Sequence, residues 1–202
     1  RRVAMSLMMM MMWGLVWVHV GLAAPMRYSD VRGRPYSVGW TQRGLTVDGR
    51  AQLLLSGDVH YARAFPAEQD RALDNLRADS LNAVQTYAFW SLHEPEPGAL
   101  CWGEADAASS AGCSAAGARA NITRFLQAAA ARDLWVVLRI GPFICGEWSY
   151  GGIPSWINGE PGVQIRAHNP AWEAAMTAFV RAIWRVVEPF TAAHGGPVLM
   201  LQ

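Results

Sequence analysis

The sequence predicts an α/β protein with one parallel sheet. Short apolar runs and amphipathic helical patterns alternate along residues 53–201, and each helix returns the chain to the same end of the sheet. Either an open doubly wound sheet or a (β/α)₈ barrel gives this order. No glycine-rich phosphate loop follows the first strand, which favours the barrel. A barrel takes eight such units and about 250 residues, so we expect only the first four β/α units of a TIM barrel here.

Each expected element has a local signal. Asp48-Gly49 favours a hairpin turn between two short extended runs. Helices are expected to begin near Pro66, at Asn121 and at Asn169-Pro170, where a capping residue or a first-turn proline precedes an apolar stripe. The runs expected to form buried strands are residues 53–55, 83–89, 135–140 and 198–201. Residues 96–120, of low sequence complexity, are expected to form a long loop.

The N-terminus resembles a targeting segment. Arg1-Arg2 precedes an apolar run, five consecutive methionines included, which ends in small residues near Gly21 and Ala23. This pattern predicts a secretory signal peptide over residues 1–24. An uncleaved membrane anchor is the alternative, since the run is nearly long enough to span a bilayer. Residues 25–36 are expected to form a polar, mobile linker, and residues 37–202 the N-terminal part of the barrel domain.

Composition limits the partners. The chain has 202 residues, 52% of them hydrophobic, and a net charge of +1, which is typical of a cored domain. No run of Lys and Arg is present to bind nucleic acid. We expect no membrane contact unless the N-terminal apolar segment is retained. No Cys/His spacing predicts a metal site.

Two modifications are open at this stage. In an oxidising compartment Cys101 and Cys113 either pair or stay reduced, and Cys145 is then left as a packed thiol. Asn121-Ile122-Thr123 fits a glycosylation acceptor, although Asn121 also fits a helix N-cap.

The chemistry of the chain is expected in the loop after residues 135–140. Glu147 lies there among aromatic residues and glycines, just past the C-terminal end of a buried strand. A carboxylate can bind sugar hydroxyls, aromatic rings can cover the apolar C–H faces, and glycines let the backbone come close. The alternative is an ordinary loop carboxylate that caps a turn. The aromatic neighbours are Phe143, Trp148, Tyr150 and Trp156.

Four segments together resemble glycoside hydrolase family 35. They are SGDVHYAR (56–63), QTYAFWSLHEP (85–95), RIGPFICGEWSYGGIPSW (139–156) and GGPVLMLQ (195–202). The resemblance implies a retaining exo-β-galactosidase on a (β/α)₈ barrel, with no organic cofactor. It also implies that Tyr87, the Cys145-Gly146 backbone and the Glu147 carboxylate bind the galactose, so Glu147 is a substrate ligand and not the proton donor.

The same resemblance implies that residues 37–202 are the N-terminal part of a glycosidase catalytic domain, truncated, and that both catalytic glutamates lie outside this chain. The acid/base is expected in an Asn-Glu pair a few residues beyond Gln202, and the nucleophile much further on. A retaining mechanism needs both carboxyls, about 5–5.5 Å apart. We therefore expect no hydrolysis by this fragment alone. The chain departs from the family pattern at Ser91, where Asn is common, and at Gly146, where Ala is common; the second change is expected to loosen the loop.

Other polar residues also follow the strands. His60 and Arg63 are expected at the strand ends where barrel sites are built, and His93 and Glu94 as a structural pair at the rim. His168 and His194 are expected in loops. The expected function is release of terminal β-linked galactose from a β-galactoside oligosaccharide or glycan, in a secreted, lysosomal or vacuolar protein. The alternatives are an inactive galactose-binding relative, or a barrel glycosidase with another sugar preference.

Overall fold

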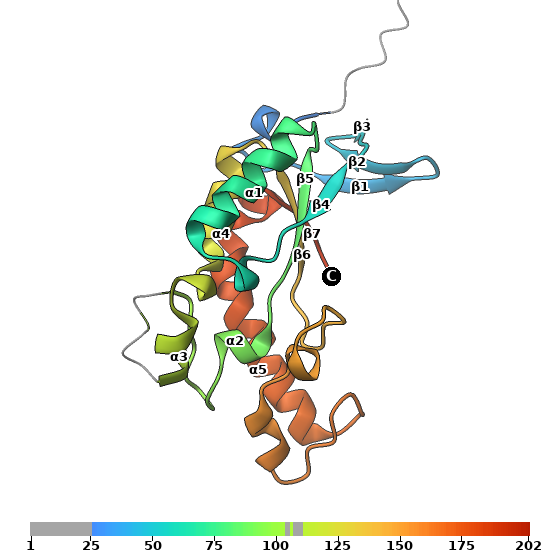
Figure 1. Ribbon diagram of the computed structural model, residues 1–202. Helices are drawn as coiled ribbons and strands as arrows, with labels where there is room; N and C mark the ends of the chain where they lie inside the picture. Colours follow the sequence, from blue (N-terminus) through green and yellow to red (C-terminus); the bar gives the residue numbers. More distant parts are fainter. Residues whose placement is uncertain (1–25, 104–105, 107–110) are drawn as a thin grey trace, which may run out of the picture.

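The computed structural model describes residues 26–103, 106 and 111–202. Within them, a four-stranded parallel sheet has the order β4-β5-β6-β7, and a three-stranded antiparallel sheet has the order β1-β2-β3. Figure 1 shows α1, α4 and α5 on one side of the parallel sheet and the small sheet near the N-terminal ends of its strands. The expected parallel α/β order is confirmed. The strands are β1 (Val38–Thr41), β2 (Gly44–Val47), β3 (Arg50–Ala51), β4 (Ser56–Asp58), β5 (Ala83–Tyr87), β6 (Trp135–Arg139) and β7 (Val198–Leu201).

The three expected helices form where their capping signals predicted. Asn121 and Asn169 each accept a hydrogen bond from a backbone N–H of the first helical turn, and Pro66 and Pro170 occupy first positions. The apolar stripe of α4 is fully buried against the sheet. The helices are α1 (Pro66–Ala78), α2 (Trp90–His93), α3 (Ala111–Ala116), α4 (Ile122–Ala131) and α5 (Pro170–Val187).

The turn at Asp48-Gly49 joins β2 to β3, as predicted. Both residues have positive φ, 46° and 74°, and Val47 pairs with Arg50 across the turn. Two consecutive left-handed residues match the right-handed twist of a tight hairpin.

The expected strand at residues 53–55 is wrong. The strand β4 begins at Ser56, and the side chains of Leu53 and Leu55 are 65% and 51% exposed. The side chain of Asn82 explains the difference. Its Nδ2 donates to the carbonyl of Leu53 at 2.8 Å, and its Oδ1 accepts from the N–H of Leu55 at 2.8 Å. These bonds satisfy backbone groups that a longer strand would pair in a ladder.

The expected loop at residues 96–120 is also partly wrong, because its described part contains α3 and a following 3₁₀ turn, Gly117–Ala120. Alanine is the best helix former, so an alanine-rich segment turns helical once a tertiary contact fixes it. That contact is a disulfide between Cys101 and Cys113, with 5.3 Å between the Cα atoms. The disulfide, left open by the sequence, is therefore present.

The described part of the expected linker, residues 26–36, belongs to the packed structure. Tyr28 and Tyr36 are buried, and each meets the ring of Trp135 edge-on, at 5.5 and 5.4 Å between centroids. Their hydroxyls donate to the carbonyls of Gly195 and Gly196. The segment thus covers the N-terminal end of the sheet. The expectation of a mobile linker is wrong for residues 26–36, because it was based on their polar residues and did not consider the two tyrosines. Residue 25 and the expected signal peptide or anchor, residues 1–24, lie outside the described residues.

Candidate functional site

The expected sugar-binding residues lie at one end of the parallel sheet. Parallel strands bring their C-terminal ends to the same edge, where loops of α/β enzymes build their sites. Figure 1 shows α2 and the long segment between β6 and α5 at this end. The segment after β4 reaches the same place through a 3₁₀ turn, Tyr61–Arg63.

Tyr87 is the last residue of β5, and it is 9% exposed. The imidazole of His60 stacks on its ring at 4.3 Å between centroids, and the guanidinium carbon of Arg139 lies 4.8 Å from the ring centroid. Its hydroxyl accepts a hydrogen bond from Nε2 of Gln85 at 3.3 Å. These contacts from three neighbouring strand ends hold the phenol in one orientation at the rim.

Gly146 packs directly against Tyr87. A β-carbon added at Gly146 would lie 2.7 Å from Cδ2 and 2.8 Å from Cε2 of the Tyr87 ring, closer than real contacts allow. The loop is held in this position by Ile144, which is buried and whose N–H donates to the carbonyl of Gly151 at 2.8 Å. The absence of a side chain at Gly146 thus allows the loop to reach Tyr87, a contact that the sequence did not predict; that glycine loosens the loop stays a prediction.

Glu147 is exposed, and its backbone has a φ of 47°. A non-glycine residue rarely adopts this left-handed conformation, so the surrounding structure must hold it. Arg63 does so, because its Nη2 donates to the carbonyl of Glu147 at 2.9 Å and also to the carbonyl of Gly146. Because these hydrogen bonds of Arg63 go to backbone carbonyls and not to the carboxylate, the Glu147 side chain stays exposed at the surface of the site. The sequence placed Arg63 at the rim but did not identify this anchoring role.

The aromatic residues around Glu147 divide into two groups. Trp148 stacks on Phe89 at 4.2 Å, and its Nε1 donates to Oγ of Ser91 at 3.0 Å. Ser91 therefore makes a hydrogen bond in this protein. Trp156 is turned toward the core, since its Nε1 donates to the carbonyl of Glu94 and its ring meets Trp90 edge-on at 6.0 Å. The expected ring of aromatics around the carboxylate is thus only partly formed.

The second group contains Tyr150, at the outer edge, and Phe143, which is half-buried and packs against the core. Tyr150 is exposed, and its hydroxyl donates to Oδ1 of Asn158 at 2.8 Å. Phe143 carries the guanidinium of Arg166 at 4.1 Å from its ring centroid.

A cavity of about 300 Å³ adjoins this loop. Cys145 borders it and is exposed, so the expectation of a packed thiol is wrong. The polar lining comes from two guanidinium groups and one amide, and Nε of Arg139 donates to Oε1 of Gln202 at 3.0 Å. The lining residues are Arg139, Gly141, Phe143, Cys145, Arg166 and Gln202.

The electrostatics of the site keep His60 neutral. Burial lowers the pKa of His60, and the nearby positive charge of Arg63 lowers it further, against the opposing charges of Asp58 and Glu147. Nδ1 of His60 is buried and has no hydrogen-bond partner among the described residues. The neutral imidazole thus lies against Tyr87 without adding a positive charge to the site.

His93 and Glu94 have the structural roles that were expected. His93 is fully buried: its Nδ1–H donates to the carbonyl of Cys101 at 2.8 Å, and its Nε2 lies 2.6 Å from the hydroxyl of Tyr61. Since a carbonyl only accepts, Nδ1 carries the proton and the Tyr61 hydroxyl donates. The Glu94 carboxylate accepts from Nε1 of Trp90 and from the N–H of Gly98.

The remaining expected residues lie away from this site. His168 is exposed and pairs with Glu173, and His194 is exposed at the opposite end of the sheet, in the turn before β7. Asn121 caps α4 through its Oδ1, and its glycosylation stays a prediction. Within the described residues, no group of three His, Cys, Asp or Glu side chains is arranged to hold a metal ion. No helix among them is long and apolar enough to cross a membrane.

The arrangement suits binding more than bond cleavage. One exposed carboxylate, a neutral imidazole, a tyrosine and backbone groups can form hydrogen bonds with a sugar, whereas Glu94 is already engaged.

The order of strands and helices resembles that of a solved structure. An exo-beta-1,4-mannosidase from Opitutaceae bacterium strain TAV5 superimposes with a TM-score of 0.54 at 16% identity, over 81% of this chain and 26% of that one. The parallel sheet and its helices therefore have the fold of part of that protein.

Sequence comparison assigns the family. The model of glycosyl hydrolases family 35 matches residues 44–202, and the chain belongs to this family. Beta-galactosidase 10 of Arabidopsis thaliana is 33% identical over 168 residues, 82% of this chain and 21% of that protein. Beta-galactosidase 12 of Oryza sativa subsp. japonica is 33% identical over 167 residues, 82% of this chain and 17% of that protein. The chain thus spans about a fifth of the length of these relatives.

Proposed function

We propose that this chain is the galactose-holding part of a retaining exo-β-galactosidase whose (β/α)₈ barrel is completed outside residues 1–202. The observation that carries the proposal is the direct contact between Tyr87 and the loop of Gly146 and Glu147. It joins two of the segments that resemble the family in one pocket rim. Family membership supports a galactoside as the substrate.

In this proposal Tyr87 and Glu147 bind ring hydroxyls, and the backbone at Cys145-Gly146 supplies further hydrogen bonds. The Glu147 carboxylate makes charge-assisted bonds, which are roughly twice as strong as neutral ones. Holding the sugar in one register is what places its glycosidic bond between two catalytic carboxyls. Both of those glutamates are proposed to lie outside this chain.

The proposed environment is a secretory one: the cell exterior, a lysosome or a vacuole. The Cys101–Cys113 disulfide supports it, since disulfides persist in oxidising compartments. A signal peptide over residues 1–24 remains part of the same proposal. Edman sequencing of the secreted protein tests it, and a mature N-terminus before residue 20 would contradict cleavage at the proposed position.

The test of the site is Glu147→Gln in the full-length protein, assayed on an aryl β-galactoside. We expect kcat/KM to fall about 10- to 100-fold, because sugar hydroxyls lose a charged partner. The matched control is Glu160→Gln, an exposed carboxylate in a neighbouring turn. Equal kcat/KM in Glu147→Gln and the control would remove Glu147 from the site. Parallel assays on β-glucosides and β-mannosides test the sugar preference.

An inactive galactose-binding relative is the second candidate, because Tyr87 and Glu147 could hold a galactose without any bond cleavage. Titration with galactose distinguishes the two when combined with the assay. Galactose binding without turnover in the full-length protein supports the binder, and turnover supports the enzyme. Residues 25–202 alone are expected to show no turnover.

A further inference from the structure

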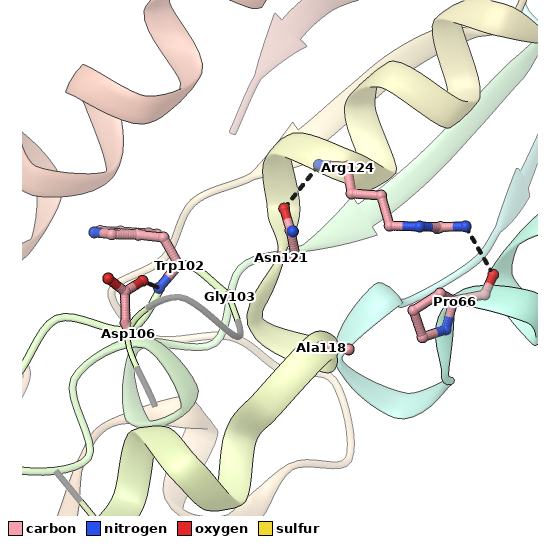
Figure 2. A pocket seen from close by; sticks show the side chains of 7 residues that line it. All are labelled: Pro66, Trp102, Gly103, Asp106, Ala118, Asn121 and Arg124. Carbon is pink, nitrogen blue, oxygen red and sulfur yellow. Dashed lines mark hydrogen bonds between the residues drawn. The ribbon is translucent and has the colours of Figure 1, made fainter. Parts of the chain in front are cut away.

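A second cavity, of about 500 Å³, lies apart from the residues of the proposed galactose site. It opens between the start of α1, the start of α4 and the segment after α2. Figure 2 shows Trp102 and Asp106 on one side of Asn121, and Pro66 and the guanidinium of Arg124 on the other. Its volume is in the range of cavities that hold small organic ligands.

Asn121 presents its amide nitrogen at the wall of this cavity. The amide oxygen is used, because it accepts from the backbone N–H of Arg124 at 2.9 Å and so caps α4. The nitrogen has no hydrogen-bond partner within the described part of the chain, and Figure 2 shows it turned away from Arg124 N. A β-carbon at Gly103 would lie only 3.1 Å from this nitrogen, so a glycine there leaves room beside it.

Capping and glycosylation therefore use different atoms of the same side chain. Asn121-Ile122-Thr123 is an acceptor sequence for N-linked glycans. We propose that Asn121 carries an N-linked glycan and that the first sugar of this glycan occupies the cavity. In the transfer, a bond forms between Nδ2 and C1 of the sugar, and the bond from C1 to the diphosphate of a lipid-linked oligosaccharide donor breaks. One amide proton leaves, and the lipid diphosphate departs.

The cavity walls match an N-acetylated sugar. The indole of Trp102 is held by His93, whose ring stacks on it at 4.7 Å, and it offers an apolar surface to sugar C–H groups. Asp106 is fixed beside it, since its Oδ2 accepts from the N–H of Trp102 at 2.7 Å. On the other side, the guanidinium of Arg124 donates to Gln69 and to the carbonyl of Pro66, and it pairs with Asp70. The Asp106 carboxylate and the remaining N–H groups of Arg124 can bind hydroxyl and acetamido groups.

This inference rests on passage through a glycosylating compartment and not on galactosidase activity, so its failure is separable from that of the proposed site. The first experiment is peptide mass spectrometry of the full-length protein secreted from a eukaryotic host. We expect a glycan on Asn121 in the unaltered protein and in Thr123→Ser, which keeps the acceptor sequence. We expect none in Thr123→Ala, which leaves the Asn121 cap in place. An unmodified Asn121 in the secreted protein would overturn the proposal.

The second experiment tests whether the first sugar occupies the cavity. A sugar bound in the cavity shields the bond between Asn121 and the glycan, so a peptide amidase that releases N-glycans should act slowly on the native protein. We expect Trp102→Ala to speed release at least tenfold, and Trp102→Phe, which keeps an aromatic ring, to stay near the original rate. Equal rates of release in all three proteins would show that the first sugar does not occupy the cavity and would overturn that part of the proposal.

A third measurement needs no change at Trp102. The glycosylated protein should unfold at a temperature about 2–4 °C above that of Thr123→Ala, because contacts of the sugar exist only in the folded state. An equal unfolding temperature in the two proteins would overturn the proposal that the first sugar occupies the cavity.

Discussion

A guanidinium nitrogen of Arg63 lies 2.9 Å from the carbonyl oxygen of Glu147, 84 residues further along the chain. This bond joins the segment after β4 to the loop after β6 and holds Glu147 in its left-handed conformation. Arg63 also faces the ring of Phe89, with 5.7 Å from its guanidinium carbon to the ring centroid. One side chain thereby connects three strand ends around the proposed site.

Arg63→Met should weaken galactoside use without unfolding the protein. Two carbonyls lose a charged donor, and the Glu147 loop is free to leave its strained conformation. We expect kcat/KM of the full-length protein to fall about tenfold or more, the effect of roughly one such hydrogen bond. Arg43→Met, in the exposed turn between β1 and β2, is the control and should be neutral. If both variants behave alike, Arg63 does not position the loop.

Gly146→Ala should disturb Tyr87. The added β-carbon would come within 2.8 Å of two ring atoms, so either the ring or the loop must move. We expect the free energy of unfolding to fall by about 1–3 kcal/mol, as for other overpacked sites, and galactose affinity to fall with it. Urea unfolding and galactose titration are the measurements. The matched control is Gly159→Ala, because nothing lies within 4 Å of a β-carbon there; equal losses at both positions would refute the contact.

His93 should make the fold sensitive to acid. Burial lowers the pKa of His93 to about 4, from 6.5 when exposed, so the unfolded chain binds a proton more readily than the folded one. Stability is therefore expected to be unaffected by this group above about pH 6.5 and to decrease as the pH falls toward 4. The full effect is about 3 kcal/mol, at about 1.4 kcal/mol per pKa unit.

Urea unfolding between pH 7 and 4 measures this dependence. His93→Gln is expected to show a shallower loss of stability on acidification, whatever its stability at pH 7. His194→Gln, at an exposed position, should keep the original pH dependence. An unchanged slope in His93→Gln would mean that the acid sensitivity comes from other groups.

The disulfide should stabilise the segment that carries α3. Replacing Cys101 and Cys113 by Ser opens a loop with a sequence separation of 12 residues. Loops of this size typically give about 2–3 kcal/mol. We expect a corresponding drop in unfolding free energy, and the same drop on reducing the unaltered protein. Cys145→Ser should be neutral, because that thiol is exposed. A double variant as stable as the unaltered protein would show that the segment is held by packing alone.

The sequence alone determined the family and the alternation of the four parallel strands with the three long helices α1, α4 and α5. Capping residues such as Asn121 and Asn169, the turn at Asp48-Gly49 and the apolar stripe of α4 are local signals, and each acts over a few residues. The family motifs likewise lie in short continuous segments. Such features were predictable because the physics that produces them does not depend on distant parts of the chain.

Tertiary structure decided which residues from distant parts of the chain are in contact. Asn82 replaces the expected ladder at Leu53 and Leu55, two tyrosines turn an expected linker into packed structure, and Gly146 lets a loop touch Tyr87. Each of these depends on a distance between residues far apart in sequence. Local propensity carries no information about such distances, since they are set only when the sheet and its helices pack together.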